Sequence, residues 1–139
     1  MPEKYYYKVI LTTVIFNKEK KILLAKRGKN ETVLPGYWGI PGGKIEALGN
    51  IQNIFEEELK REVREEVGIE INNIHYVENH LHESGKINVC FISTLLSGNP
   101  KALDETEEVG WFTLSEAKEM LLTPHTLERI TLASKKIKK

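Results

Sequence analysis

The order of elements that the sequence predicts is typical of a mixed α/β sandwich, in which a mixed β-sheet lies between helices. Two pairs of β-branched and aromatic-rich runs each flank a polar turn, a helical run lies between the pairs, and a strand and helices follow. A doubly wound sheet would instead alternate single strands with helices. We expect one domain over residues 1–139, because a chain of this length with 40% hydrophobic composition forms a single core.

The first two strands are expected at residues 5–16 and 22–27. The run YYYKVILTTVIF favours a strand, and polar residues 17–21 separate it from ILLAKR. Residues 28–44 then carry five glycines and two prolines, so we expect a structured loop or a very short strand there. This loop has neither GxGxxG nor a phosphate-loop pattern ending in Gly-Lys-Ser/Thr, which excludes those two nucleotide-binding folds.

A helix is expected over residues 54–67, in the run IFEEELKREVREEV. Its apolar residues recur every four positions, the spacing of one helix face, and Gly68 supplies a stop. At about 100° per residue, Glu58, Glu62, Glu65 and Glu66 share the neighbouring stripe. Burial of the apolar stripe therefore places these carboxylates at the edge of a cleft.

The rest of the chain predicts a second hairpin, a short strand and two helices. Residues 71–83 and 86–96 flank the turn residues Ser84-Gly85, and VGWFTL is a short strand. Ser115 is expected to begin a helix with Glu116 behind it, and a terminal helix follows Pro124 into the basic end KKIKK. The single cysteine, Cys90, lies in an apolar run, which predicts a buried thiol and a reducing, cytoplasmic environment.

Overall charge excludes two classes of partner. Lys plus Arg and Asp plus Glu both total 20, so no net field favours nucleic acid or an anionic membrane. No apolar run reaches the roughly 18 residues that a bilayer-spanning helix needs. Any phosphate chemistry must therefore be local.

The acidic stripe has two interpretations. Taken alone, such a run is most often a charged amphipathic helix with mixed i,i+4 pairs. Carboxylates within reach of one another also raise one another's pKa unless a divalent ion neutralises them, and hard oxygen ligands suit Mg²⁺ or Mn²⁺. The glycines of the preceding PGYWGIPGGK favour the metal interpretation, because they allow a phosphate or a metal to approach the main chain.

These residues resemble the Nudix hydrolase family, in its mutator-type (MutT-like) branch. The family pattern is Gly-x5-Glu-x7-Arg-Glu-U-x-Glu-Glu-x-Gly-U, where U is aliphatic. REVREEVGI (residues 61–69) matches its second half, and PGGKIE (residues 41–46), with Trp38 before it, resembles the first half. The resemblance covers essentially the whole chain and implies a Nudix-type α/β/α sandwich with a mixed sheet between helices.

One departure from the family pattern lies before the helix. Asn53 stands where the family has its first glutamate, and Gly43 is four residues further upstream than the pattern allows, because the stretch ALGNIQN lengthens the loop. In the family this glutamate supports the loop and the helix start. Asn is itself a good N-cap, so the departure affects the position of the loop more than the metal site.

Carried over by position, the resemblance implies a divalent-metal site. Glu62, Glu65 and Glu66 would ligate Mg²⁺ or Mn²⁺ together with the carbonyl of Gly42, and Arg61 would hold the glutamates in orientation. The implied reaction is attack of water on phosphorus within a diphosphate linked to a nucleoside. Metal ions neutralise the phosphate oxygens and lower the pKa of water, and Glu65 or Glu66 is the expected base.

A distant glutamate is also implied, as a ligand or as a base. Glu107 or Glu108, just before VGWF, is the candidate, with Glu108 as the expected metal ligand, and a solvated DETEE turn is the alternative. Trp38 or Tyr37 could stack on a base, although Trp38 could equally anchor the loop as a core aromatic. Gly43 and Lys44 are candidates for phosphate contact, and a lysine there is also an ordinary turn residue.

The substrate implied by this branch is a nucleoside triphosphate, including oxidised or deoxy purine nucleotides, cleaved to the monophosphate and pyrophosphate. Branches that act on ADP-ribose or dinucleoside polyphosphates tend to carry a Pro or a Tyr shortly after the family pattern. The corresponding stretch here, LHESGKIN (residues 81–88), has neither. The alternatives are an ADP-ribose or nucleoside-diphosphate-sugar hydrolase and, from another class, a nucleotide-sensing module without turnover. The resemblance also allows a homodimer.

The histidines give a weaker signal. His80 and His82 alternate on an expected strand and so share a face, a spacing that could bind a metal. Without a further His or Cys nearby, a surface strand is the favoured interpretation. His75 and His125 have no expected partner.

Overall fold

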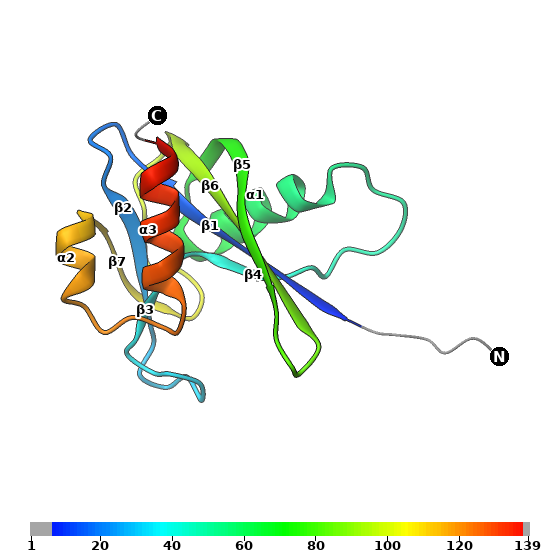
Figure 1. Cartoon of the computed structure of the whole chain (residues 1–139), viewed down its shortest axis with the longest axis horizontal. Coiled ribbons are helices and arrows are strands. Elements are labelled where there is room, and N and C mark those ends of the chain that lie inside the picture. Colours follow the sequence, from blue (N-terminus) through cyan, green and yellow to red (C-terminus); the bar gives the residue numbers. More distant parts are fainter. Residues whose placement is uncertain (1–6, 138–139) are drawn as a thin grey trace.

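The computed structural model describes residues 7–137 and contains a mixed β-sheet with helices on both faces (Figure 1). The expected fold class is therefore confirmed. Neighbouring strands follow the order β3-β2-β1-β6-β5, while β4 pairs with β1 and β7 pairs with β2. The strands are β1 (Lys8–Phe16), β2 (Ile22–Arg27), β3 (Trp38–Gly39), β4 (Gly42–Lys44), β5 (Glu70–Leu81), β6 (Lys86–Ser97) and β7 (Thr106–Phe112). The helices are α1 (Ile54–Val67), α2 (Leu114–Lys118) and α3 (Thr126–Ile137).

Strand β1 is the centre of the sheet. It pairs in parallel with β6 along its whole length, from Lys8 opposite Lys86 to Phe16 opposite Thr94. The expected hairpin between β1 and β2 forms only at its turn, where Phe16 faces Ile22, since β2 pairs mainly with β7. Long-range pairing of this kind leaves no local sequence pattern. Tyr5 and Tyr6, which were expected in the first strand, lie outside the described residues.

Two apolar clusters cover the two faces of the sheet. Successive side chains of a strand point to opposite faces. Leu11 and Ile15 of β1 accordingly pack with Leu59 of α1, whereas Val14 packs on the other face with Ile130 of α3. The α1 layer and the α2–α3 layer are thus held on one sheet by alternate residues of the same strands.

Helix α1 occupies the residues expected for it. Leu59, Val63 and Val67 are fully buried, and Gly68 ends the helix in a left-handed conformation with φ 70°. The Gly68 N–H donates to the carbonyls of Val63 and Arg64, as a glycine C-cap does. Asn53 lies at the N-cap position, but its φ is 57° and its side chain makes no capping hydrogen bond.

The C-terminal elements differ in their bounds from the expected ones. β7 begins at Thr106, three residues before the expected VGWFTL, because the DETEE segment pairs with β2. α2 is capped by Thr113, not begun by Ser115: the Thr113 hydroxyl accepts from the Glu116 N–H, and the Glu116 carboxylate accepts from the Thr113 N–H. Only a residue three positions before Glu116 can make this reciprocal pair.

Two further expectations concern Cys90 and the membrane. Cys90 is buried, as expected, and burial raises the pKa of its thiol to about 11. Among residues 7–137, no helix combines the length and the apolar character that a membrane span requires. Lys138 and Lys139, in the expected basic helix end, lie outside the described residues.

Candidate active site

The glycine strand β4 lies between β1 and the acidic face of α1. β4 pairs antiparallel with β1, with Thr12 opposite Gly42 and Leu11 opposite Gly43. A Cβ atom on Gly42 would collide with the backbone of Leu11. A Cβ atom on Gly43 would lie 2.6 Å from the carboxyl carbon of Glu62, so a side chain there would displace that carboxylate. Glycine is therefore required at position 42 by the close approach of β4 to β1, and at position 43 by its close approach to α1.

Arg61 links three carboxylates of α1. Its Nε donates to Glu58 at 3.1 Å, its Nη2 donates to Glu62 at 3.0 Å, and its Nη1 donates to Glu65 at 2.9 Å. Positions three and four residues apart are neighbours on a helix, which explains the contacts with Glu58 and Glu65. The hydrogen bond with Glu58 is the main cause of a raised Arg61 pKa.

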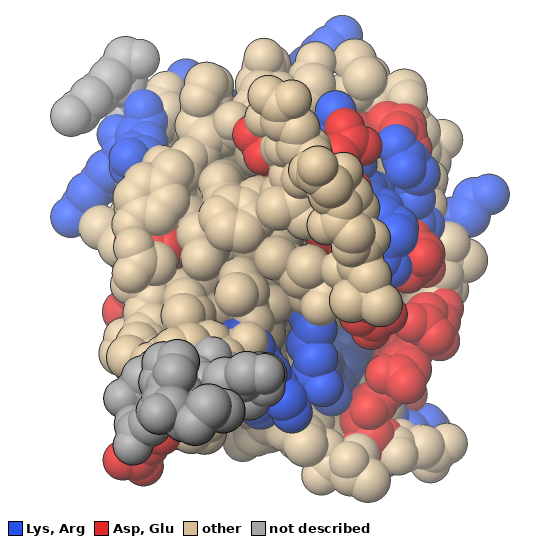
Figure 2. Space-filling model, turned by 90° about the vertical axis from the view of Figure 1, so that its right-hand side faces the viewer, with Lys and Arg blue, Asp and Glu red and all other residues tan. Residues whose placement is uncertain are grey.

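The charged side chains near α1 are of both signs. Figure 2 faces the end of the molecule from which the loop before α1 projects in Figure 1. Acidic and basic side chains lie intermingled along one side of this view, and most of the remaining face is uncharged. The expected acidic stripe is thus partly neutralised, in particular by Arg61.

Glu66 lies at the wall of a cavity of about 190 Å³. Burial raises the pKa of Glu66 to about 8, and the charge of Glu62 acts in the same direction, whereas a backbone hydrogen bond from Gly42 opposes the shift. Burial also raises the pKa of Glu62, against the effect of Arg61. In the absence of a cation, burial therefore disfavours the charged form of both carboxyl groups.

The same cavity collects charged residues from two other segments. Lys26 and Arg27 come from the end of β2, and Asp104 and Glu105 come from the loop before β7. Sequence reasoning missed these residues, because only the long-range pairing of β2 with β7 brings them together. The remaining lining residues are Ala25, Gly39, Ile40, Gly42, Thr106 and Thr123.

The expected metal-site residues are only partly brought together. Gly42 and Glu66 line the cavity, and Glu62 lies against Gly43. Glu65 is exposed and bound to Arg61. Glu108 is exposed on β7 outside the cavity, whereas Glu107 lies 3.6 Å from the Lys26 ammonium.

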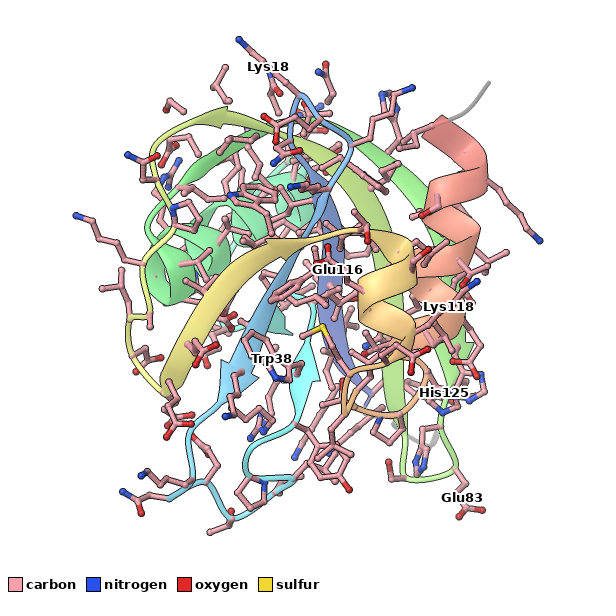
Figure 3. The ribbon with its side chains drawn as sticks, turned by 90° about the vertical axis from the view of Figure 1, so that its left-hand side faces the viewer. Lys18, Trp38, Glu83, Glu116, Lys118 and His125 are labelled. Atoms are coloured by element: carbon pink, nitrogen blue, oxygen red, sulfur yellow. The ribbon has the colours of Figure 1, made fainter. Side chains whose placement is uncertain are left out.

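The expected substrate-binding residues lie in different places. Trp38 packs edge-on against Phe112, with ring centroids 5.3 Å apart, at the border of the apolar cluster beneath α2 and α3 (Figure 3). This is the arrangement of a core aromatic that anchors the loop. Lys44 is exposed at the end of β4 and does not line the cavity.

His80 and His82 do not act as a pair. The His80 ring lies 5.6 Å from that of His125, which Figure 3 shows beside the β5–β6 hairpin, and His82 contacts Ser84 in the turn. His125 thus has a neighbour that its sequence context did not reveal.

The donor set at α1 fits a hard divalent cation in its chemistry. The carboxylates of Glu62, Glu65 and Glu66 and the carbonyl of Gly42 are all oxygen donors, the type that Mg²⁺ and Mn²⁺ prefer. Within residues 7–137, no three His, Cys, Asp or Glu side chains are already gathered as a metal site. Arg61 holds Glu62 and Glu65 instead, so a cation has to compete with its guanidinium for them.

Comparison with known proteins gives matches over nearly the whole chain. The sequence model of the NUDIX domain family matches residues 7–133. Among solved structures, the MutT NUDIX hydrolase from Burkholderia pseudomallei is 28% identical, with a TM-score of 0.68, and the match covers 90% of this chain and 98% of that one. The sheet and helices described above are therefore shared with solved proteins of this kind.

Two curated relatives have different named activities. The ADP-ribose pyrophosphatase of Methanocaldococcus jannaschii is 28% identical over 116 residues, which is 80% of this chain. The nucleoside triphosphatase NudI of Klebsiella pneumoniae is 25% identical over 135 residues, which is 87% of this chain. The chain spans 65% of the length of the first relative and 92% of the second.

Proposed function

Because the chain belongs to the NUDIX domain family, we propose that it is a divalent-metal-dependent nucleotide pyrophosphohydrolase. In this proposal, water attacks phosphorus and a nucleoside triphosphate is cleaved to the monophosphate and pyrophosphate. The observation that carries the proposal is that the glycine strand β4 lies against Glu62 and meets Glu66 at a cavity. Carboxylates and close main-chain approach are what a metal–phosphate complex needs.

The proposed roles follow from position and contact. Glu62, Glu65, Glu66 and the carbonyl of Gly42 would hold Mg²⁺ or Mn²⁺, and Arg61 orients Glu62 and Glu65 through its hydrogen bonds. A bound divalent ion supplies neutralisation of the phosphate oxygens and lowers the pKa of water. Glu66 lines the cavity and Glu65 does not, so Glu66 is the first carboxylate to test as the proton acceptor.

Basic residues support an anionic substrate. Lys26 and Arg27 line the same cavity as Glu66, and ammonium and guanidinium groups are the usual side-chain partners of phosphate. Arg27 is held in place, since its Nε donates to the Val33 carbonyl at 2.7 Å and its guanidinium lies 3.4 Å from Glu31. A phosphate chain that reaches from α1 toward β2 would meet both cations.

A second candidate substrate class is ADP-ribose or a nucleoside-diphosphate sugar. The name of the archaeal relative favours it, and the name of the bacterial relative favours a triphosphate. The match spans more of the length of the bacterial relative than of the archaeal one. In addition, the stretch LHESGKIN (residues 81–88), which follows the family pattern, lacks the Pro or Tyr that is typical of the ADP-ribose branches. We therefore place the triphosphate first.

The test is a substrate panel with Mg²⁺ and with Mn²⁺, in which products are separated and identified. Release of pyrophosphate from a nucleoside triphosphate is the expected result. A sugar phosphate released from ADP-ribose, with triphosphates left intact, would instead establish the second candidate. Binding of nucleotides without metal-dependent turnover of any of them would identify a nucleotide-sensing module and overturn the proposal.

Matched variants connect the activity to the site. Glu66→Gln is expected to lower kcat about 100-fold or more, as loss of a general base does. Glu57→Gln, on an exposed position of the same helix, is the control and should leave kcat unchanged. An unchanged kcat in both Glu66→Gln and Glu65→Gln would contradict the assigned chemistry.

A further inference from the structure

We propose that Glu58 is a positioning residue of the metal site, which fixes the Arg61 guanidinium and thereby keeps Glu62 and Glu65 available to a divalent cation. The inference rests on the proposed metal site and goes beyond it, because position 58 is an unspecified residue in the family pattern. It starts from a contrast within one helix: Glu58 is 5% exposed, whereas its neighbours Glu56 and Glu57 are exposed.

A buried carboxylate has to be paired. Removal of a charge from water is costly unless a partner and hydrogen bonds replace the lost solvation. Both Nε and Nη2 of Arg61 donate to Glu58 Oε2, and among the described residues no buried side-chain N or O atom lacks a hydrogen-bond partner. Arg61 is therefore the group that supplies hydrogen bonds to the buried Glu58 carboxyl group.

The pairing fixes the plane of the guanidinium. Arginine presents its donors in a rigid fork, so two donors held by one carboxylate determine where the remaining N–H groups point. In Arg61 the remaining contacts run from Nη1 to Glu65 at 2.9 Å and from Nη2 to Glu62 at 3.0 Å. Glu58 thus acts on the two proposed ligands through Arg61 and does not itself line the cavity.

The positive charge of Arg61 does not act equally on the three carboxylates that it contacts. One guanidinium serves three carboxylates, and Glu58 is the most buried of them, with side-chain exposures of 6% for Glu58, 13% for Glu62 and 54% for Glu65. Electrostatic attraction is strongest where solvent screens least. The positive charge is therefore directed mainly to Glu58, and its competition with a cation for Glu62 and Glu65 is reduced.

The N-cap side chain of α1 does not take part in this contact. Asn53 makes no side-chain capping bond, and in the family pattern its position belongs to the glutamate that supports the loop and the helix start. The first buried charged contact of α1 is therefore the Glu58–Arg61 pair, one turn into the helix.

Direct Mn²⁺ binding tests the proposal without reliance on turnover. The free Mn²⁺ concentration is measured by electron paramagnetic resonance for wild type, Glu58→Gln and Glu57→Gln. We expect Glu58→Gln to weaken Mn²⁺ binding about tenfold, the size of effect found when a residue that supports metal ligands is removed. Glu57→Gln removes the same charge from an exposed neighbouring position and should bind Mn²⁺ as wild type does.

A second readout reports on Arg61 in the metal-free protein. The Nε–Hε resonance of Arg61 should be sharp and shifted in wild type and in Glu57→Gln, and should move toward the free-arginine position in Glu58→Gln. The double variant Glu58→Gln/Arg61→Lys should bind Mn²⁺ no more weakly than Arg61→Lys alone, because the two residues act as one unit.

Several outcomes would overturn the proposal. They are unchanged Mn²⁺ affinity in Glu58→Gln, equal losses in Glu57→Gln and Glu58→Gln, or multiplied losses in the double variant. Should Glu58→Gln not fold, Glu58→Met, with an uncharged side chain of similar length, takes its place with the same expectation. Tight Mn²⁺ binding that depends on Glu58, in a protein that hydrolyses no nucleotide, would refute the proposed function and leave this inference standing.

Discussion

Glu66 connects the proposed metal site to the stability of the protein. Its pKa in the folded state is about 8, above the 4.5 of a free glutamate, so between these pH values the folded protein retains a proton that the unfolded chain has released. The free energy of unfolding should therefore be greatest below the unfolded pKa and fall as pH rises toward 8. In metal-free protein we expect a loss on the order of 3 kcal/mol between roughly pH 5 and 8.

Urea unfolding in the presence of a chelator, at a series of pH values, measures this loss. Glu66→Gln carries no titrating group at this position and should flatten the pH dependence. A fall of equal size in Glu66→Gln and wild type would assign the effect to another group. Added Mg²⁺ should reduce the slope in wild type, because a cation bound to Glu66 replaces the proton.

Gly43 offers a second test at the scale of one residue. A Cβ atom there would lie 2.6 Å from the Glu62 carboxyl carbon, so Gly43→Ala should displace Glu62 and lower turnover at least about tenfold. Its cost in melting temperature should largely disappear in a Glu62→Ala background, since the group that clashes is then absent. An equal cost in both backgrounds would place the strain in the β4 backbone.

The placement of single residues could be predicted where it depends on helix periodicity. The shared face of Glu62, Glu65 and Glu66 follows from the sequence because α1 is regular. The burial of Glu58 could not be predicted, since it depends on what packs beside that face. For Trp38, which lies against Phe112, the sequence left both interpretations open because nothing local distinguishes a stacking platform from a core aromatic.

Among the helices and strands, α2 has a start whose capping residue can be identified by mutation. The capping box joins Thr113 and Glu116, so Thr113→Ala should lower the free energy of unfolding by about 1 kcal/mol. Ser115→Ala, on an exposed residue of the same helix, should change it by less than about 0.5 kcal/mol. Urea unfolding of both variants makes the comparison, and a larger effect at Ser115 would contradict the observed cap.

Elements with strong local signals could be predicted, and those that depend on distant partners could not. α1 was predicted to the residue because an apolar stripe and a glycine stop coincide at Val67 and Gly68. β7 was predicted too short, since the acidic residues before Val109 favour a turn until β2 supplies their pairing partner.

At the scale of the whole molecule, the parallel ladder between β1 and β6 should be the most protected part of the structure. It joins strands that are about 80 residues apart in sequence, and its central residues, such as Val14 and Cys90, are fully buried. Hydrogen exchange there should require global unfolding. Amides of α2 and of the loop after β2 should exchange much faster.

Hydrogen–deuterium exchange followed by NMR or mass spectrometry checks this expectation. Faster exchange in β1 and β6 than in α3 would show that the ladder is not the stable centre. The same ladder explains why the sequence predicted two hairpins but not their arrangement: each hairpin has a local turn signal, whereas the β1–β6 pairing rests on burial of both strands in one core.

The long loop between β4 and α1 has a consequence for protein engineering. Leu48 is 92% exposed, and the neighbouring Gly49, with φ 108°, has open space around its Cα. Exposed loop tips of this kind tolerate insertions well. A fluorescent reporter peptide inserted at Leu48-Gly49 would be tethered to β4 on one side and α1 on the other, so its signal could follow metal loading in living cells without a label on any ligand residue.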